Sequence, residues 1–397
     1  MNNLGKKPLE GVTVIALEQA VAVPFATRQL ADLGARVIKI ERPGEGDFAR
    51  HYDRSVKGMS SHFVWLNRSK ESITLDLKHP AGNEILTRLL AKADVFIHNL
   101  APGAVDRLGF DVATLKRTLP QLIVCNVSGY GSWGPYREKK AYDLLVQAES
   151  GLLSITGTEE SLAKVAISVA DIAAGMYAYS GVLTALYQRM QTGKGTAIEV
   201  TLLEALGEWM GYPAYYTDYS GQPPARSGAR HATIAPYGPF ALVDGTNILI
   251  GIQNEREWTG FCATVLENPE LAEDLRFFSN AERVKHRTQL EVLIQEHFRT
   301  MTSAQAIERL ETAQIAYGQM RTVQDFLEHP QLKARERWRA VDSPVGPLWA
   351  LRPPATLEGV EPVFDPIPAL GQHTDAILQE LGYSKEQIEE LRTKGTL

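Results

Sequence analysis

The sequence predicts an α/β fold built on a parallel sheet of the doubly wound kind. Short apolar runs rich in β-branched residues alternate with stretches of helical periodicity through the first 200 residues. This strand–helix–strand order is typical of parallel sheets. The 397 residues are 44% hydrophobic and 22% charged, which is the composition of a globular protein with one large domain or two ordinary ones.

The first half of the chain is expected to supply the sheet and its covering helices. Strands are expected at 11–17, 35–41, 94–99, 122–129 and 196–202, and helices at 24–34, 83–93 and 114–120. Gly34 and the turn "TGKG" at 192–195 are expected to end helices. Ligands bind at the carboxyl ends of the strands in such sheets, so the residues there are candidates for function.

The second half of the chain changes character. The stretch 212–240 is rich in Pro, Gly, Tyr and Ser, and we expect a linker or a long functional loop there. A hairpin with an Asp-Gly turn is expected at 241–252, a helical region at 255–311 and a last helix at 374–383. The segment from about 225 to about 320 is expected to be a smaller domain inserted into the α/β body.

Charge and cysteine content exclude several classes of protein. The net charge of −6, from 41 basic and 47 acidic residues, argues against a general nucleic-acid binder but allows a local basic pocket for a phosphorylated small molecule. Two distant cysteines, Cys125 and Cys262, predict no disulfide framework and a reducing, cytoplasmic location. The start "MNNLGKKPLEG" lacks the apolar run of a signal peptide.

Several well-known motifs are missing from the sequence. It contains no GxGxxG after the first strand, no GxxxxGK[ST], no HExxH, no CxxC and no GxSxG. These absences argue against a dinucleotide fingerprint, a phosphate-binding loop, a metal site and a serine hydrolase. The expected site therefore contains no metal.

One carboxylate, Asp171, lies in the otherwise apolar segment "VAISVADIAAGMYAYSGVL". The segment approaches the length of a membrane span, but we interpret it as a buried helix that follows a strand-like "VAISVA". Asp171 is either the N-cap of this helix or a nucleophile, and the two roles are compatible. At a helix start it is expected to stay ionised at neutral pH. Small neighbours, namely Ala170, Ala173, Ala174 and Gly175, are expected to leave it sterically open.

Basic residues follow several of the expected strands. They are Arg42, Lys78, Arg107 and Lys140. Each one taken singly is explained as a solvated surface charge. Together they fall near the ligand-binding edge of the expected sheet, where cations could hold a polyphosphate.

The sequence resembles the class III CoA-transferases, the formyl-CoA transferase and carnitine CoA-transferase group. The resemblance runs from "PLEGVTVIAL" to "LGQHTDAILQELG" and includes "LADLGARVIKIERPGEGDFAR", "ADVFIHNLAPGAVDRLGF", "VSGYGSWGPY" and "DIAAGMYAYSGVLTALYQRMQTGKG". It implies a Rossmann-like large domain from both chain ends, a smaller middle α+β domain and an interlocked homodimer. The implied boundaries are 1–200 and 325–397 for the large domain, 201–224 for a linker and 225–324 for the small domain.

The resemblance also implies roles for individual residues. Asp171 matches the nucleophilic aspartate of the family. Residues that match CoA-contacting positions are Val21, Ala22, Arg42, Leu75, Lys78, Asn99, Arg107 and Lys140, although the family often has Gln where Val21 stands. The CoA thioester is then a substrate, and no permanently bound cofactor is implied.

Two other functions remain open on the sequence. The same superfamily includes α-methylacyl-CoA racemases, which have a histidine where "AYD" places Tyr142. Tyrosine, with a pKa of about 10, replaces that histidine poorly in proton transfer, so transfer is favoured over racemisation. A non-catalytic CoA-binding protein, with Asp171 only as a cap, is the third possibility.

The acyl groups are the least determined part of the expectation. The segment "SGARHATIAPYG" stands where formyl-CoA transferases have a glycine-rich loop, which argues against oxalate. Its residues Arg230, His231 and Tyr237, and Arg226 just before it, could bind a distal carboxylate. Tyr142 is a further expected substrate contact. We expect succinyl-CoA as the donor and itaconate, mesaconate, citramalate, malate or glutarate as the acceptor, with 212–240 as the lid that excludes water.

Overall fold

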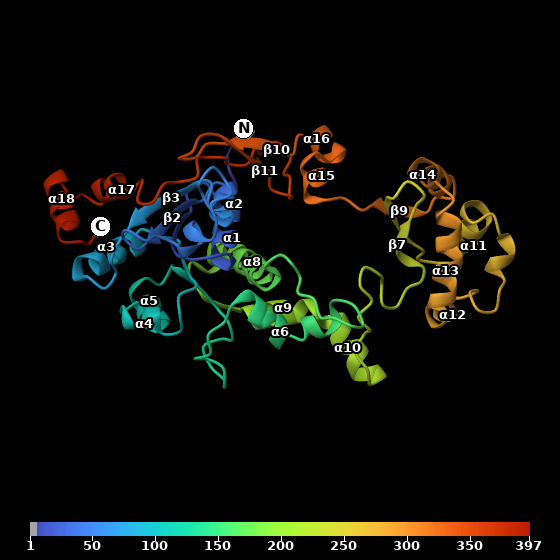
Figure 1. The fold of residues 1–397 in the computed structure, drawn as a ribbon. Coiled ribbons are helices and arrows are strands. Elements are labelled where there is room, and N and C mark those ends of the chain that lie inside the picture. The colour runs from blue at the N-terminus through green and yellow to red at the C-terminus, as the bar shows by residue number, and fades with distance from the viewer. Residues whose placement is uncertain (1–5) are drawn as a thin grey trace. The chain divides into compact units, whose positions relative to one another are not determined.

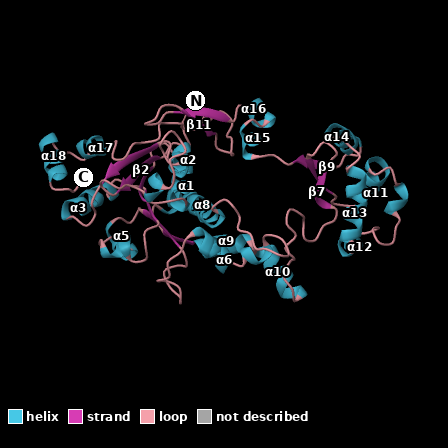
Figure 2. Ribbon diagram, viewed as in Figure 1, coloured by secondary structure: helices cyan, strands magenta, loops and turns pink. Residues whose placement is uncertain are grey.

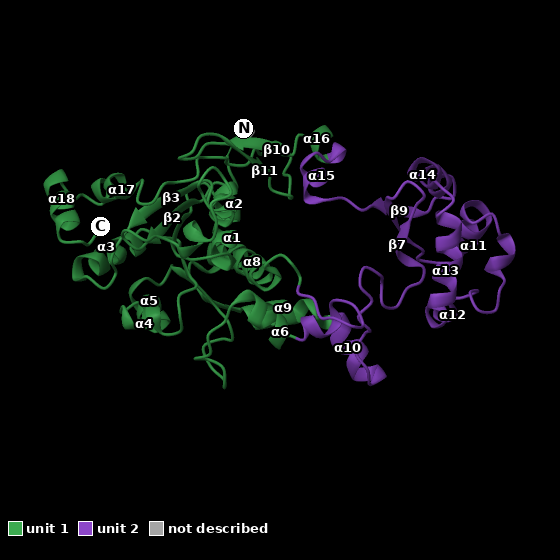
Figure 3. Ribbon diagram, viewed as in Figure 1, with its two compact units in different colours: residues 1–150, 165–211, 332–397 green, residues 151–164, 212–331 purple. Residues whose placement is uncertain are grey.

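The computed structural model describes residues 6–397, which divide into two units (Figure 3). Unit 1 comprises residues 1–150, 165–211 and 332–397, and unit 2 comprises residues 151–164 and 212–331. The expectation of no signal peptide concerns the first eleven residues, and residues 1–5 of these lie outside the described residues. Each unit has its own hydrophobic core.

A six-stranded parallel sheet organises the described part of unit 1 (Figure 1). Its strands, in spatial order, are β3 (Lys70–Thr74), β2 (Arg36–Glu41), β1 (Thr13–Leu17), β4 (Val95–His98), β5 (Ile123–Ser128) and β6 (Ala197–Thr201). The predicted α/β class with a parallel sheet is confirmed. The order places the topological switch point between β1 and β4, where such sheets bind ligands.

Helices surround this sheet, and the last ones come from the far end of the chain (Figure 2). The helical elements of unit 1 are α1 (Ala22–Asp32), η1 (Phe48–His51), α2 (Ser61–Leu66), α3 (Pro80–Leu90), α4 (Ala104–Arg107), α5 (Val112–Thr118), α6 (Asp143–Glu149), α8 (Val169–Thr192), α9 (Leu202–Trp209), α17 (Thr374–Glu380) and α18 (Lys385–Thr393). Ile377 of α17 and Ile388 of α18 belong to the same core as Ile15 and Phe96 of the sheet. A hairpin of β10 (Trp338–Val341) and β11 (Leu348–Leu351) completes the unit.

Unit 2 combines a small antiparallel sheet with short helices. Its strands are β7 (Tyr237–Ala241), β8 (Asn247–Gly251) and β9 (Ala316–Gln319). Its helical elements are α7 (Leu152–Ile155), α11 (Glu255–Gly260), η2 (Phe261–Val265), η3 (Pro269–Ala272), α12 (Asn280–Lys285), α13 (Arg287–Phe298), α14 (Ser303–Thr312) and α15 (Val323–Leu327). Two helices span the unit boundaries, α10 (Gly211–Ser220) and α16 (Pro330–Ala334).

Most predicted elements are confirmed, and the exceptions have physical causes. The expected strands and the first three helices match β1, β2, β4, β5, β6, α1, α3 and α5, and the expected hairpin is β7–β8. The stretch 212–240 is not all loop, because α10 occupies its start, and α9 and α10 lie in the expected linker 201–224. The prediction took the prolines of this stretch as a sign of loop structure, but Pro213 lies in the first turn of α10, where proline is tolerated.

Helix α8 carries Asp171 and packs against α1, α6, β5 and β6. The strand-like "VAISVA" is not a strand, because Ser168 is the residue before the helix and α8 starts at Val169. Within residues 6–397, α8 is the one helix long and apolar enough to span a membrane, by length and composition only. Its packing against α1 and the sheet is typical of a core helix of a globular protein.

Gly175 lets α8 approach the loop that follows β1. A Cβ atom at Gly175 would lie 2.6 Å from the carbonyl oxygen of Ala22, closer than real Cβ atoms approach. The neighbouring Ala170, Ala173 and Ala174 are fully buried. These small residues therefore serve the packing of α8, while Asp171 itself lies on the lining of a pocket.

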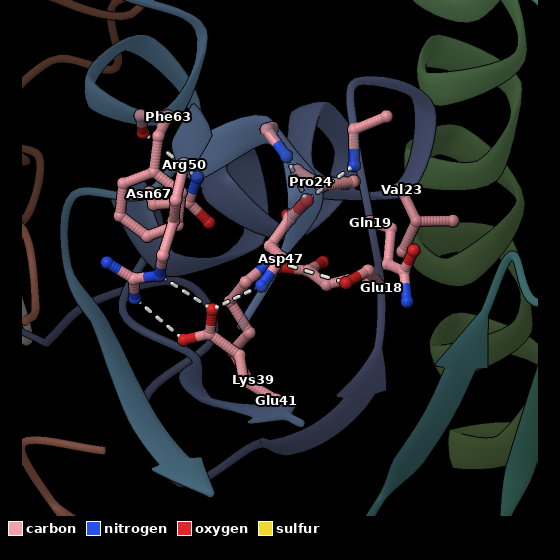
Figure 4. Close-up of polar contacts among 12 residues, drawn as sticks. Glu18, Gln19, Val23, Pro24, Lys39, Glu41, Asp47, Arg50, Phe63 and Asn67 are labelled. Atoms are coloured by element: carbon pink, nitrogen blue, oxygen red, sulfur yellow. Dashed lines mark hydrogen bonds and ion pairs between the residues drawn. The ribbon is translucent and has the colours of Figure 1, made fainter. Parts of the chain in front are cut away.

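A buried network of charges lies beneath the loop after β1 (Figure 4). Lys39 Nζ contacts Asp47 Oδ2 at 2.8 Å and Glu18 Oε1 at 3.3 Å, and Lys70 Nζ contacts Glu18 Oε1 at 2.7 Å. All four side chains are buried. Burial alone lowers the pKa of Lys39, but the charges of Asp47 and Glu18 raise it above its usual value, so Lys39 is held in its charged form.

Asp47 connects this network to two neighbouring segments. Its Oδ1 accepts hydrogen bonds from the backbone N–H of Ala20 at 3.0 Å and of Ala49, in η1, at 2.9 Å. Ala20 has a φ of 61°, a left-handed conformation that alanine rarely adopts. The hydrogen bond from Ala20 to a buried carboxylate compensates for this strain and fixes the loop after β1.

Replacement of Lys39 tests the importance of the network. Lys39→Met leaves Asp47 buried without its cation, and we expect a loss of about 3–5 kcal/mol in the free energy of unfolding, measured by urea denaturation. Lys394→Met removes an exposed ion pair with Glu390 and should cost less than about 1 kcal/mol. Equal effects of the two substitutions would contradict a structural role for the buried network.

Candidate active site

A pocket of about 1310 Å³ lies along the carboxyl edge of the unit 1 sheet. It is lined by the segments that follow β1, β2, β3, β4 and β5, by Leu202 after β6, and by Asp171 on α8. The described residues that line the pocket all belong to unit 1. The pocket therefore lies where parallel sheets bind their ligands.

The switch point between β1 and β4 is closed by a pair of hydrogen bonds. Asn99 Oδ1 accepts from the backbone N–H of Gln19 at 2.9 Å, and Asn99 Nδ2 donates to the carbonyl oxygen of Gln19 at 2.9 Å. Val21 and Ala22 follow directly and are buried at the start of α1. The Asn99 amide thus holds the loop whose backbone faces the pocket.

The predicted CoA-contacting positions all line this pocket. They are Val21, Ala22, Arg42, Leu75, Lys78, Asn99, Arg107 and Lys140. The four cationic side chains among them are exposed, and Arg42 contacts Glu45 at 2.8 Å. Their roles in CoA binding remain a prediction, but the structure brings them to one edge of the sheet.

Two further cations, Arg137 and Lys139, also line the pocket. They were not singled out from the sequence. Lys139 Nζ lies 4.3 Å from the ring centre of Tyr136 and pairs with Glu149. Both cations lie in the stretch "YREKKAYD", where only Lys140 had been considered. Six cations on the pocket lining match a ligand with several phosphate charges.

Asp171 is the third residue of α8 and is partly buried in the pocket lining. Burial, with a smaller contribution from the charge of Asp143, raises the pKa of Asp171 to about 7. The expectation that the helix start keeps Asp171 fully ionised at neutral pH is therefore wrong. A half-protonated carboxylate near pH 7 is a stronger base than an exposed aspartate, and its ionised form is a better nucleophile.

The N-cap role expected for Asp171 is taken by another residue. Asp143 Oδ1 accepts from the backbone N–H of Ala170 at 2.8 Å and of Asp171 at 3.3 Å. Asp143 thus satisfies donors in the first turn of α8 that would otherwise lack partners. The side chain of Asp171 is thereby left to face the pocket.

Aromatic residues lie at the same part of the pocket as Asp171. Tyr142 is exposed and immediately precedes α6, and Tyr52 follows η1. Burial and the charges of Asp47 and Asp171 raise the pKa of Tyr52 to about 12. Tyr52 and His62 meet edge to face at 5.3 Å. Tyr52 and His62 were missed, although both follow the strand β2 and could have been found as residues beyond a strand end.

The other predicted substrate residues lie in unit 2 and are not part of the pocket lining. His231 stacks on Tyr237 with ring centres 5.3 Å apart. The Arg226 guanidinium donates to the carbonyl oxygens of residues 154, 158 and 159, and Arg230 pairs with Glu291 at 2.7 Å. Both arginines thus have structural partners within unit 2, and a role in substrate binding stays a prediction.

Potential metal ligands and the two cysteine thiols are the other candidates for chemistry in the structure. Within residues 6–397, no group of three or more His, Cys, Asp or Glu side chains could hold a metal ion. Cys125 and Cys262 are buried, and burial raises the pKa of each thiol to about 12. Asp171 is therefore the best candidate for a nucleophile in the pocket.

The fold and the pocket define an α/β protein that carries a partly buried carboxylate of raised pKa beside a rim of six cations at the edge of its parallel sheet. The description "CoA-transferase family III" matches residues 9–374, so the chain belongs to that family. It is a class III CoA-transferase, and members of this class use CoA thioesters as substrates. The resemblance seen in the sequence is confirmed.

Relatives of known description agree with this assignment. The human succinyl-CoA:glutarate CoA-transferase is 33% identical over 100% of this chain and 91% of its own length. The succinyl-CoA–D-citramalate CoA-transferase of Chloroflexus aurantiacus is 33% identical over 98% of both chains. A crystal structure of a CAIB/BAIF family protein from Brucella suis is 34% identical, with a TM-score of 0.83 over 95% of this chain and 100% of that chain.

The raised pKa of Asp171 predicts a pH-dependent cost to stability. The pKa of the carboxyl is about 7 in the folded chain and about 3.9 in an unfolded one, so folding takes up a proton between these pH values. The wild-type chain therefore loses stability as the pH rises from about 4 to about 7, whereas the amide of Asp171→Asn does not titrate.

We therefore expect Asp171→Asn to melt at a higher temperature than the wild type at pH 8, with a smaller difference at pH 5. Differential scanning fluorimetry at the two pH values measures this. Asp375→Asn, at an exposed position, serves as the control and should show no such pH-dependent gain. Identical melting temperatures of the wild type and Asp171→Asn at pH 8 would show that Asp171 is not held in a destabilised ionised state.

Proposed function

We propose that this enzyme transfers CoA from succinyl-CoA to a small dicarboxylate, with glutarate or citramalate as the first candidates and itaconate, mesaconate and malate as further ones. The observation that carries this proposal is the Asp171 carboxylate on the lining of a pocket rimmed by cations. The relatives that act with succinyl-CoA support the choice of donor and of acceptor class.

In the proposed mechanism Asp171 is the nucleophile. One carboxylate oxygen attacks the succinyl thioester carbonyl, and the C–S bond breaks. The CoA thiolate departs, and a succinyl–aspartyl anhydride is formed. The thiolate then attacks the aspartyl carbonyl, which releases succinate and forms an aspartyl-CoA thioester. The acceptor carboxylate displaces the thiolate to give a second anhydride. Attack of the thiolate on the acceptor's acyl carbonyl releases the new thioester and regenerates the Asp171 carboxylate.

We propose that the cationic rim, which is the set of six cations that line the pocket, binds the CoA phosphates. The proposed contacts are Arg42, Lys78, Arg107 and Lys140. The backbone at Val21 and Ala22 is proposed to approach CoA, with Leu75 and Asn99 as further contacts. Tyr142 lines the pocket beside Asp143 and is proposed to contact the acyl group. Holding the thioester next to Asp171 would replace a bimolecular encounter by a reaction within one complex.

Replacement of Asp171 tests the nucleophile. Asp171→Asn should lower kcat by about 1000-fold or more, since the covalent intermediate cannot form. The affinity for CoA should change by less than about 3-fold, because the cationic rim is intact. Hydroxylamine added to wild-type enzyme with succinyl-CoA should give a hydroxamate on the peptide that contains Asp171, detected by mass spectrometry. Unchanged turnover in Asp171→Asn would reject the proposed mechanism.

The acceptor is determined by a panel of acids with succinyl-CoA. Chromatography should detect new CoA thioesters with glutarate or another of the small dicarboxylates, and little product with oxalate. Deuterium exchange at the α-carbon of a 2-methylacyl-CoA, with no acceptor acid present, would instead indicate a racemase. Binding of CoA without any turnover would indicate a non-catalytic CoA-binding protein.

We also propose that a second copy of the chain covers the outer face of α8, as the resemblance to the interlocked dimers implies. Met190 is 85% exposed and Tyr187 is 65% exposed on this helix, and Met176 and Tyr177 are more than one third exposed. A helix that is apolar on all sides is ordinarily buried on all sides. Exposed apolar patches of this kind mark interaction sites.

The molar mass in solution tests the dimer. Light scattering coupled to size exclusion should give twice the mass of one chain, and the double replacement of Met190 and Tyr187 by Glu should shift the distribution to the single chain. Tyr219→Glu changes an aromatic residue that is 82% exposed on α10. It serves as the control and should leave the molar mass unchanged. A monomeric wild type that binds lipid vesicles would assign this face to a membrane instead.

A further inference from the structure

Asp143 links three segments at the start of α8. Its Oδ1 accepts the two hydrogen bonds from Ala170 and Asp171 described above, at 2.8 and 3.3 Å. Its Oδ2 accepts from Gln147 Nε2 at 2.8 Å, one helical turn further along α6. Both carboxylate oxygens are therefore used, and the carboxylate is held in one orientation.

Gln147 also holds the chain that leads into α8. Its Oε1 accepts from the backbone N–H of Val165 at 3.0 Å, and its Nε2 contacts the carbonyl oxygen of Val165 at 3.3 Å. The Gln147 side chain is fully buried. The Gln147 amide thus connects Asp143 to the start of the segment 165–171, and Asp143 itself holds the end of this segment, where the nucleophile of the proposed function lies.

We infer that Asp143 is a positioning residue for the transfer reaction: its carboxylate, oriented by Gln147, caps α8 so that the side chain of Asp171 remains free and correctly placed to attack the thioester. This inference rests on the proposed function, because it gives Asp143 a role only if Asp171 is the nucleophile. A capping aspartate at the start of α8 itself would have used its own oxygens on the backbone. The separate residue Asp143 divides capping and chemistry between two carboxylates.

The charge of Asp143 has a second effect on Asp171. Like charges held close together disfavour ionisation, which adds to the effect of burial on Asp171. Tyr142, Tyr52 and His62 also line this pocket, and Tyr52 interacts with the charge of Asp171. Tyr52 stays neutral, since its pKa is raised to about 12. Asp143 and His62 are therefore the two groups whose replacement must be compared.

Two substitutions at position 143 separate the charge from the hydrogen bonds. Asp143→Asn keeps an oxygen for the N–H groups of α8 but removes the charge, together with the acceptor for Gln147 Nε2. Because the charge is lost, the midpoint of the rise of kcat/KM with pH should fall by about one unit. Asp143→Ala also removes the cap, and kcat should fall by about 100-fold through misplacement of Asp171. The KM for succinyl-CoA should change by less than about 3-fold in both variants. His62→Gln should leave the midpoint unchanged.

The outcomes distinguish this inference from the proposed function. An inactive Asp171→Asn together with a wild-type pH midpoint and kcat in Asp143→Asn and Asp143→Ala would overturn the inference alone. An active Asp171→Asn would overturn the proposed function first. If the Asn and Ala variants fail to fold, Asp143→Glu keeps the charge on a longer side chain: a lowered kcat with an unmoved midpoint supports the inference, and a wild-type kcat rejects it.

Discussion

The pairing of Lys39 with Asp47 beneath the sheet edge is the interaction on which the pocket depends. A buried lysine and a buried aspartate lose much hydration energy, which their mutual attraction offsets, and Glu18 places a second carboxylate beside Lys39. Asp47 uses its remaining oxygen to hold Ala20 and to cap η1. One ion pair therefore fixes two walls of the pocket, the loop after β1 and the segment that leads to Tyr52.

The pocket combines two environments that a CoA thioester requires. Exposed cations such as Lys78 and Arg107 gather along the strand ends, where a charged ligand can remain partly hydrated. Asp171 lies on a core helix whose approach to Ala22 depends on Gly175, and burial there makes its carboxylate more basic. The packing of α8 that buries Asp171 thus also sets the basicity of its carboxylate, and the consequence is a lower stability of the fold when Asp171 is ionised.

The sequence was sufficient for five of the six strands of the sheet, because these strands are defined by local runs of apolar residues. β1 and β5 each contain a run of buried apolar residues, at 14–17 and 123–125. β3 was not predicted, since "KESIT" is polar for a buried strand, and its Lys70 and Ser72 are buried because they bond to Glu18 and Glu41. The capping of α8 could not be predicted either, because Asp143 lies 28 residues before Asp171 in the chain. The raised pKa of Asp171 comes from burial and from the charge of Asp143, and both causes exist only in the folded chain.

The participation of α17 and α18 in the sheet core has a consequence for biosynthesis. Ile377 and Ile388 pack with strand residues such as Ile15, which are made more than 350 residues earlier. Domains fold as units during synthesis, at about 5–20 residues per second. The strands of unit 1 must therefore wait on the ribosome while the whole of unit 2 is made, with apolar surface uncovered for tens of seconds. A chaperone that shields the nascent sheet during this interval would act on unit 1 and not on unit 2, whose core residues all lie between Phe240 and Ile315.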